Sequence, residues 1–104
     1  MTDIEIVEQE YAELQEIFKD WSSISSPEEF DSKIRHTNIT QPNKCENEGG
    51  YYYCDFDYGH LNTSISYTEK DGFTLSDTAT LYDDEGNWKG DFELTNGKAT
   101  LMTY

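Results

Sequence analysis

The two histidines and two cysteines of the chain are the side chains best suited to binding a metal or attacking a substrate. A zinc site built from such a set usually presents its ligands in pairs, a few residues apart on a tight turn. Here successive members are separated by nine, nine and six positions, so no pair of this kind exists. We therefore expect no bound metal and no other cofactor. The set comprises His36, Cys45, Cys54 and His60.

The cysteines also lack the surroundings of a nucleophile. A reactive cysteine needs nearby positive charge to stabilise its thiolate, whereas Glu46 follows Cys45 and Asp55 follows Cys54. These acids raise the thiol pKa. The pattern favours a buried Cys54 on the core face of a strand and an incidental Cys45, and it leaves open a disulfide between them that would bridge a loop to the first strand. Two cysteines are too few for a secreted disulfide scaffold.

The acidic residues do not form a catalytic pattern either. The segment 83–87 holds three consecutive acids and a glycine, but it lacks the ligand spacing of an EF-hand calcium loop and lies between expected strands. We expect a hairpin turn there. With 22 acids in the chain, two that lie close together say nothing about glycoside hydrolysis. Phosphate-binding and nucleophile-elbow motifs are also missing from the sequence. We therefore expect no enzyme.

Net charge is the feature that most constrains the partner. Twenty-two acidic residues against seven lysines and arginines give −15, and ten of the acids, with one base, lie in residues 1–31. Such a field repels nucleic acid and anionic membranes and attracts basic surfaces. We expect a basic protein surface as partner, with neither direct nucleic-acid nor membrane binding. No apolar run reaches the length of about 20 residues that spans a bilayer, and no secretory signal pattern is present, so we expect a cytoplasmic protein.

The elements that position these residues follow from two hydrophobic periods. Over the first 21 residues, apolar side chains recur every three or four positions, which predicts an amphipathic helix. A second, short helix is expected after Ser26, with Ser26 as N-cap, Pro27 at the first helical position and Glu29 closing a capping box. The apolar stripe of the first helix consists of Ile4, Val7, Tyr11, Leu14, Phe18 and Trp21.

From Tyr51 onward the period changes to two, as in strands with one buried face. Short turns, including the hairpin signal Asn96-Gly97, separate five expected strands. The prediction is one α+β domain over 1–104, with a helical part at 3–36, a polar loop at 37–50 and an antiparallel sheet at 51–104. One long and one short N-terminal helix pack on this five-stranded meander. The helical stripe suits packing within one chain or in a dimer, so the oligomeric state is open.

Two surfaces are candidates for partner binding. On the long helix, four acids lie opposite the apolar stripe. On the first predicted strand, two tyrosines and two acids share the outward face, and tyrosine is enriched at interfaces because it combines rigid area with a polar tip. Carboxylates beside it would engage arginine or lysine. The helix set is Glu5, Glu13, Glu16 and Asp20, and the strand set is Tyr51, Tyr53, Asp55 and Asp57.

These observations lead us to expect a small acidic, non-catalytic binding protein. It would inhibit a basic, nucleic-acid-handling partner such as a nuclease, by electrostatic occlusion or nucleic-acid mimicry. Carboxylates three or four residues apart on a helix are about 5–6 Å from each other, comparable to phosphates along a strand. In size and composition this is analogous to phage-encoded anti-defence (anti-CRISPR-like) inhibitors and to immunity proteins.

Two alternatives stay open. In the first, the acidity only keeps a structural protein in solution. In the second, the sheet and the first helix enclose an aromatic pocket for a small ligand. That pocket would be lined by Tyr52, Phe56, Tyr67 and Trp88.

Overall fold

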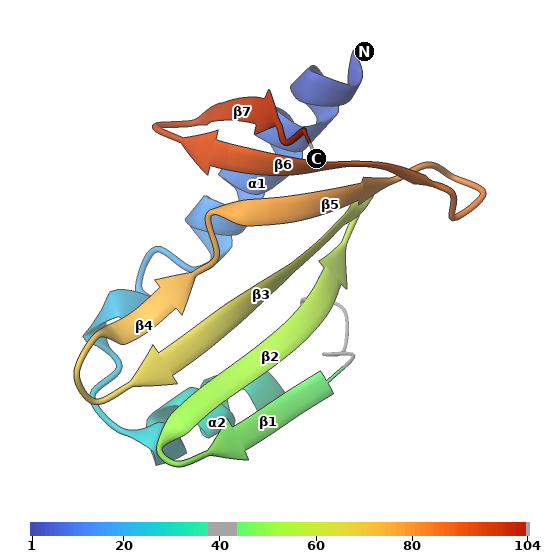
Figure 1. Cartoon of the computed structure of the whole chain (residues 1–104). Coiled ribbons are helices and arrows are strands. Elements are labelled where there is room, and N and C mark those ends of the chain that lie inside the picture. Colours follow the sequence, from blue (N-terminus) through green and yellow to red (C-terminus); the bar gives the residue numbers. More distant parts are fainter. Residues whose placement is uncertain (38–43, 104) are drawn as a thin grey trace.

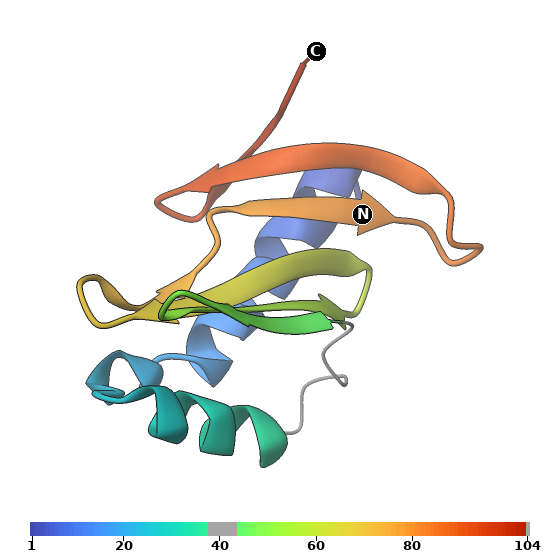
Figure 2. The ribbon, with the colours of Figure 1, turned by 60° about the horizontal axis from the view of Figure 1, so that its bottom comes forward.

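Two helices cover one face of a single antiparallel sheet (Figures 1 and 2), which confirms the predicted α+β class. The computed structural model describes residues 1–37 and 44–103. For residues 44–48 it describes the backbone alone. The helices are α1 (Asp3–Ile17) and α2 (Pro27–Arg35), with the 3-10 turn η1 (Trp21–Ser23) between them. The strands are β1 (Lys44–Glu48), β2 (Tyr51–Tyr58), β3 (Leu61–Thr68), β4 (Gly72–Leu75), β5 (Thr78–Tyr82), β6 (Trp88–Thr95) and β7 (Lys98–Leu101).

Capping residues fix where both helices begin. The Thr2 hydroxyl accepts a bond from the Glu5 amide (3.2 Å), and the Glu5 carboxylate accepts one from the Thr2 amide (3.1 Å), which together form a capping box. At α2, the Ser26 hydroxyl accepts from the Glu29 amide (3.2 Å), and Pro27 occupies the first helical position as predicted. Within the described residues, neither helix combines the length and the apolar character needed to cross a bilayer.

The sheet order is β1-β2-β3-β5-β6-β7, and β4 also pairs with β3. Two details differ from the predicted five strands. The segment expected as one strand after Gly72 is divided into β4 and β5, because the chain bends at Asp77, directly after Ser76, whose amide donates to the Ser64 carbonyl (2.9 Å). The predicted loop at 37–50 contains β1, which pairs with β2 although its sequence has no apolar alternation. Residues 38–43 of the predicted loop lie outside the described part of the chain.

The core lies between α1 and the inner face of the sheet. Phe18 is at its centre, with its ring centroid 4.7 Å from that of Trp21, 5.8 Å from that of Phe56 and 5.6 Å from that of Phe73. The predicted stripe is buried from Val7 onward, whereas Ile4 is 43% exposed. The reason is that the first turn of α1 extends beyond the sheet (Figure 1).

Two polar side chains of α1 bind the sheet backbone. The Tyr11 hydroxyl donates to the Ser76 carbonyl (2.7 Å), at the bend between β4 and β5. The Glu8 carboxylate accepts from the Ala99 amide of β7, the strand at one end of the sheet (2.9 Å). Burial and the nearby carboxylate of Asp77 raise the pKa of Tyr11, so its hydroxyl stays a donor. These contacts fix the helix along the sheet.

Cys54 lies in the core, as predicted, with 2% of its surface exposed. It is disulfide-bonded, so the expectation of a free buried thiol is wrong and the alternative left open from the sequence is favoured. Cys45, the only other cysteine in the chain, lies directly opposite Cys54 in the register of β1 and β2.

Candidate functional site

The outer face of the sheet, turned away from the helices, brings the predicted strand set together. On β2, Cys54 and Phe56 point into the core, and alternation therefore places Tyr51, Tyr53, Asp55 and Asp57 outward. The rings of Tyr51 and Tyr53 stack, with centroids 6.1 Å apart. The Tyr53 hydroxyl donates to Oδ1 of Asp55 (2.6 Å), and this bond raises the pKa of Tyr53.

A polar hollow of about 290 Å³ opens on this face where the chain passes from β4 to β5. Asp55 from β2 and Asp91 from β6 are the two carboxylates in its described lining. The rest of the lining consists mainly of hydroxyl and amide side chains. These other residues are Tyr53, Asn62, Thr63, Ser64, Ser76, Thr78, Ala79, Thr80 and Met102.

Trp88 joins the outer face through Asp91. Oδ1 of Asp91 accepts from the Thr80 hydroxyl (2.7 Å) and from the Trp88 indole N–H (3.2 Å). Both of these donors are neutral groups, and they orient the carboxylate. The indole itself is 58% exposed, an unusual position for a large aromatic side chain. Trp88 was predicted only as part of the alternative aromatic pocket, and Asp91 was not among the predicted site residues.

The aromatic pocket proposed as an alternative is not formed. Phe56 is fully buried and Tyr67 is 3% exposed, and both pack in the core. Tyr52 packs against the margin of that core, whereas Trp88 lies exposed beside Asp91. Burial of the Phe56 and Tyr67 rings is favourable because each removes much apolar area from water.

The helix set is divided among local roles instead of forming one patch. The Glu5 side chain belongs to the N-terminal cap, and Oε1 of Glu13 accepts the Tyr58 hydroxyl (3.0 Å). Glu16 pairs with Lys19 at 2.6 Å, in an exposed contact of the kind that contributes little stability. Asp20 is exposed next to η1. Since α1 covers the inner face of the sheet, its polar side and the outer face point in opposite directions.

Comparisons with known proteins do not assign this face a function. No protein-family model, curated protein or solved structure matches the chain. Function is therefore inferred from the chemistry of the outer face alone. The distinguishing observation there is a concave surface that combines exposed aromatic rings with carboxylates held by neutral donors.

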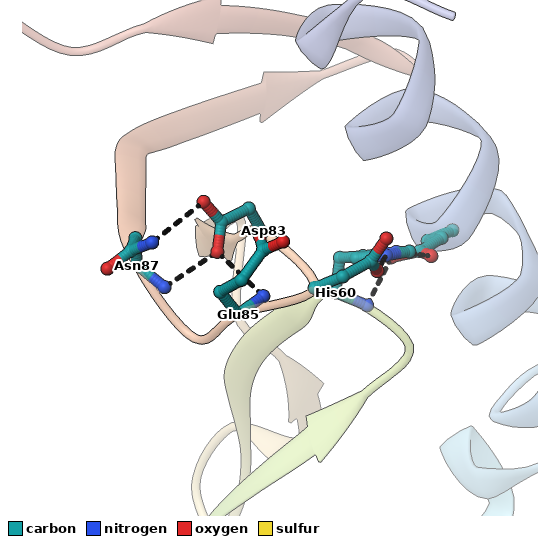
Figure 3. A network of polar contacts seen from close by, with 6 residues as sticks. His60, Asp83, Glu85 and Asn87 are labelled. Carbon is teal, nitrogen blue, oxygen red and sulfur yellow. Dashed lines mark hydrogen bonds and ion pairs between the residues drawn. The ribbon is translucent and has the colours of Figure 1, made fainter.

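Both ring nitrogens of His60 contact carboxylates, a role that the sequence did not indicate. Its Nδ1 lies 2.9 Å from Oε2 of Glu10 on α1, and its Nε2 lies 2.6 Å from Oδ1 of Asp84 in the β5–β6 turn (Figure 3). These bonds, first that of Glu10 and then that of Asp84, raise the pKa of His60. Because both ring nitrogens contact carboxylates, His60 is placed to clamp three elements together, not to serve as a general base.

Gly59 allows this clamp to close. The residue has φ +56°, and a Cβ there would lie 2.5 Å from Oε2 of Glu10. Glu10 uses the space to accept the His60 amide as well (2.8 Å). The β2–β3 turn is therefore held against α1 through a side chain that only a glycine neighbour admits.

The adjacent segment 83–87 is a hairpin turn between β5 and β6, as predicted. Oδ1 of Asp83 accepts from the amides of Glu85 (3.0 Å) and Asn87 (2.8 Å), and Oδ2 accepts from the Asn87 side chain (3.1 Å) (Figure 3). These bonds, led by that of the Asn87 backbone, lower the pKa of Asp83. The Asp83 carboxylate thus stabilises the turn in which it lies.

Replacing His60 by glutamine is expected to change how stability depends on pH. The folded-state pKa of His60 lies above its usual 6.5, so its contribution is complete below that pH and is lost as the pH rises through the folded pKa. Urea unfolding at a series of pH values would measure this. Above neutrality the wild type should lose stability relative to its own value at pH 6 more than His60→Gln does. Parallel profiles for the two proteins would contradict the clamp.

Proposed function

We propose that this chain is a small acidic, non-catalytic binding protein that inhibits a basic, nucleic-acid-handling partner, such as a nuclease. The outer face would occupy the cationic surface that nucleic acid otherwise contacts. One observation carries the proposal: exposed tyrosine and tryptophan rings lie beside carboxylates on a concave sheet face. Interfaces draw most of their binding energy from such aromatic anchors, while complementary charge speeds association.

The outer face is favoured over the polar side of α1 for two reasons. Glu16 on the helix is paired with the cation Lys19, whereas the described side-chain contact of Asp55 is with a neutral tyrosine hydroxyl. The large apolar residues that are exposed on the helix, Ile4 and Ile17, are aliphatic and not aromatic. Its acids suit the rival proposal, a coat that keeps the protein in solution.

A cytoplasmic location also stays a proposal. The disulfide at Cys54 weighs against it, because thiols in the cytosol are kept reduced. An inhibitor acting there would carry Cys54 as a thiol. Since Cys54 faces the core and the candidate residues of β2 face outward, the binding face does not depend directly on that bond.

Capture at increasing salt tests the proposed function. The immobilised protein is expected to retain a nucleic-acid-binding protein at low salt and to release it steeply between about 50 and 500 mM, because screening weakens charge-based contacts. The captured partner should then lose its binding to labelled DNA as the acidic protein is added. Retention that is insensitive to salt, or a partner that binds DNA equally well in its presence, would refute occlusion by charge.

A further inference from the structure

We propose that the hollow on the outer face, together with Trp88 at its margin, is a receptor site for an arginine side chain of the partner. This inference rests on the proposed function and names the chemical group that the face recognises. The guanidinium would pair with Asp91 and stack on the exposed indole. Asp55, across the same hollow, would stabilise its charge.

The contact between Trp88 and Asp91 provides the recognition geometry. The indole N–H donates to Oδ1 of Asp91, so the ring and the carboxylate are held next to each other and both reach solvent. A guanidinium is planar and suits both surfaces at once, because it binds a carboxylate through its edge and an aromatic ring through its face. With 58% of Trp88 exposed, the ring has a surface for this contact.

The second carboxylate and the hydroxyl groups complete the site. Asp55 is oriented by Tyr53 and lines the hollow opposite β6, and hydroxyl and amide groups such as Ser64, Thr80 and Asn62 lie between. An arginine has five N–H donors, and carboxylate and hydroxyl oxygens can accept them. An apolar ligand would leave these lining groups without the hydrogen bonds that water gives them.

None of the lysines, arginines and histidines whose side chains the structure describes is among the lining residues of this hollow. Lys89, although next to Trp88, lines a different hollow together with Asp3 and Asp83. A β-bulge between Leu81 and Tyr82 causes this separation, since it shifts the register opposite Trp88. Lys44 lies opposite Asp55 in the register of β1 and β2, so the test below includes a variant at this position.

Two capped peptides of equal length and charge, tetra-arginine and tetra-lysine, test the proposal. At about 20 mM salt, where charge contacts are weakly screened, their dissociation constants follow from the shift of the Trp88 indole N–H signal in NMR titrations. The buried Trp21 provides an internal reference signal. We expect tetra-arginine to bind about two- to fivefold more tightly, the range of an exposed cation–π contact.

Single substitutions show which residues cause the preference for tetra-arginine. Asp91→Asn should remove it with little change of shape, and so should Trp88→Leu, read from backbone amide shifts instead of the indole. Lys44→Gln should leave the preference intact and strengthen binding of both peptides. The matched control Asp71→Asn removes an exposed acid from the β3–β4 turn and should also leave the preference unchanged.

Each outcome separates the two proposals. Equal affinity for both peptides, or a preference that survives Trp88→Leu, overturns the arginine site but leaves the acidic binding face standing. If neither peptide binds at low salt, the arginine site and the electrostatic function both fall. Thermal unfolding of each variant shows that it is folded, which Trp88→Leu should be because the indole is mostly exposed.

Discussion

Reversing Asp55 and Asp57 to lysine is expected to weaken binding of the basic partner by at least about tenfold, a loss of roughly 1.4 kcal/mol or more. Both residues lie on the outer face of β2, so the double variant places two positive charges where the partner's cations would dock. The readouts are displacement of labelled DNA from the captured partner and titration with the tetra-arginine peptide.

Reversal of Glu16 and Asp20 on the other side of the molecule is the matched control. Both double variants have the same net charge, so a general effect of charge would weaken binding equally in the two. We expect the helix variant to lose much less affinity. Equal losses would favour a diffuse acidic coat, and a larger loss in the helix variant would transfer the binding face to α1.

Phe56→Ala is expected to lower the free energy of unfolding by about 3–5 kcal/mol, the usual range for removing a buried phenylalanine ring. Phe56 is fully buried, and its ring meets that of Phe18 edge-on at 5.8 Å. A domain of this size has only about 5–15 kcal/mol in total. Urea denaturation measures the change.

The neighbouring variant Tyr51→Ala provides the comparison, because Tyr51 lies on the same strand with 46% of its surface exposed. Its unfolding free energy should change by less than about 1 kcal/mol. If both variants lose the same stability, the alternation of buried and exposed residues along β2 is wrong, and with it the outer face.

Most of the fold could be predicted because two hydrophobic periods, one helical and one of two residues, determine most of its elements. The spacing of Val7, Tyr11 and Leu14 predicts the buried side of α1, and the alternation around Phe56 predicts both faces of β2. Strand β1 was missed because its polar sequence shows no alternation, although it pairs with the neighbouring β2 across the two-residue turn Gly49-Gly50. Which residues of the apolar stripe are buried also depends on where the sheet ends, and for this reason the exposure of Ile4 was not predicted.

The candidate site was only half accessible from the sequence. Alternation alone puts Tyr53 and Asp55 on one face, and the structure does so. The hollow depends on which strands become neighbours, and alternation would place Trp88 on the same side as Phe92. The β-bulge opposite Trp88 interrupts that alternation and brings the indole to Asp91. The local sequence signal of this bulge is Gly90, which lies where the register shifts and has φ +147°.

The bond between Glu8 and the Ala99 amide affects how copies of this chain meet each other. The outermost strand of an open sheet can template the addition of another strand, and repeated addition produces fibrils. At β7 an incoming strand would have to displace a carboxylate from Ala99 and approach its negative charge. The Glu8 carboxylate therefore disfavours the addition of a further strand at this edge, on the side of the molecule opposite the outer face.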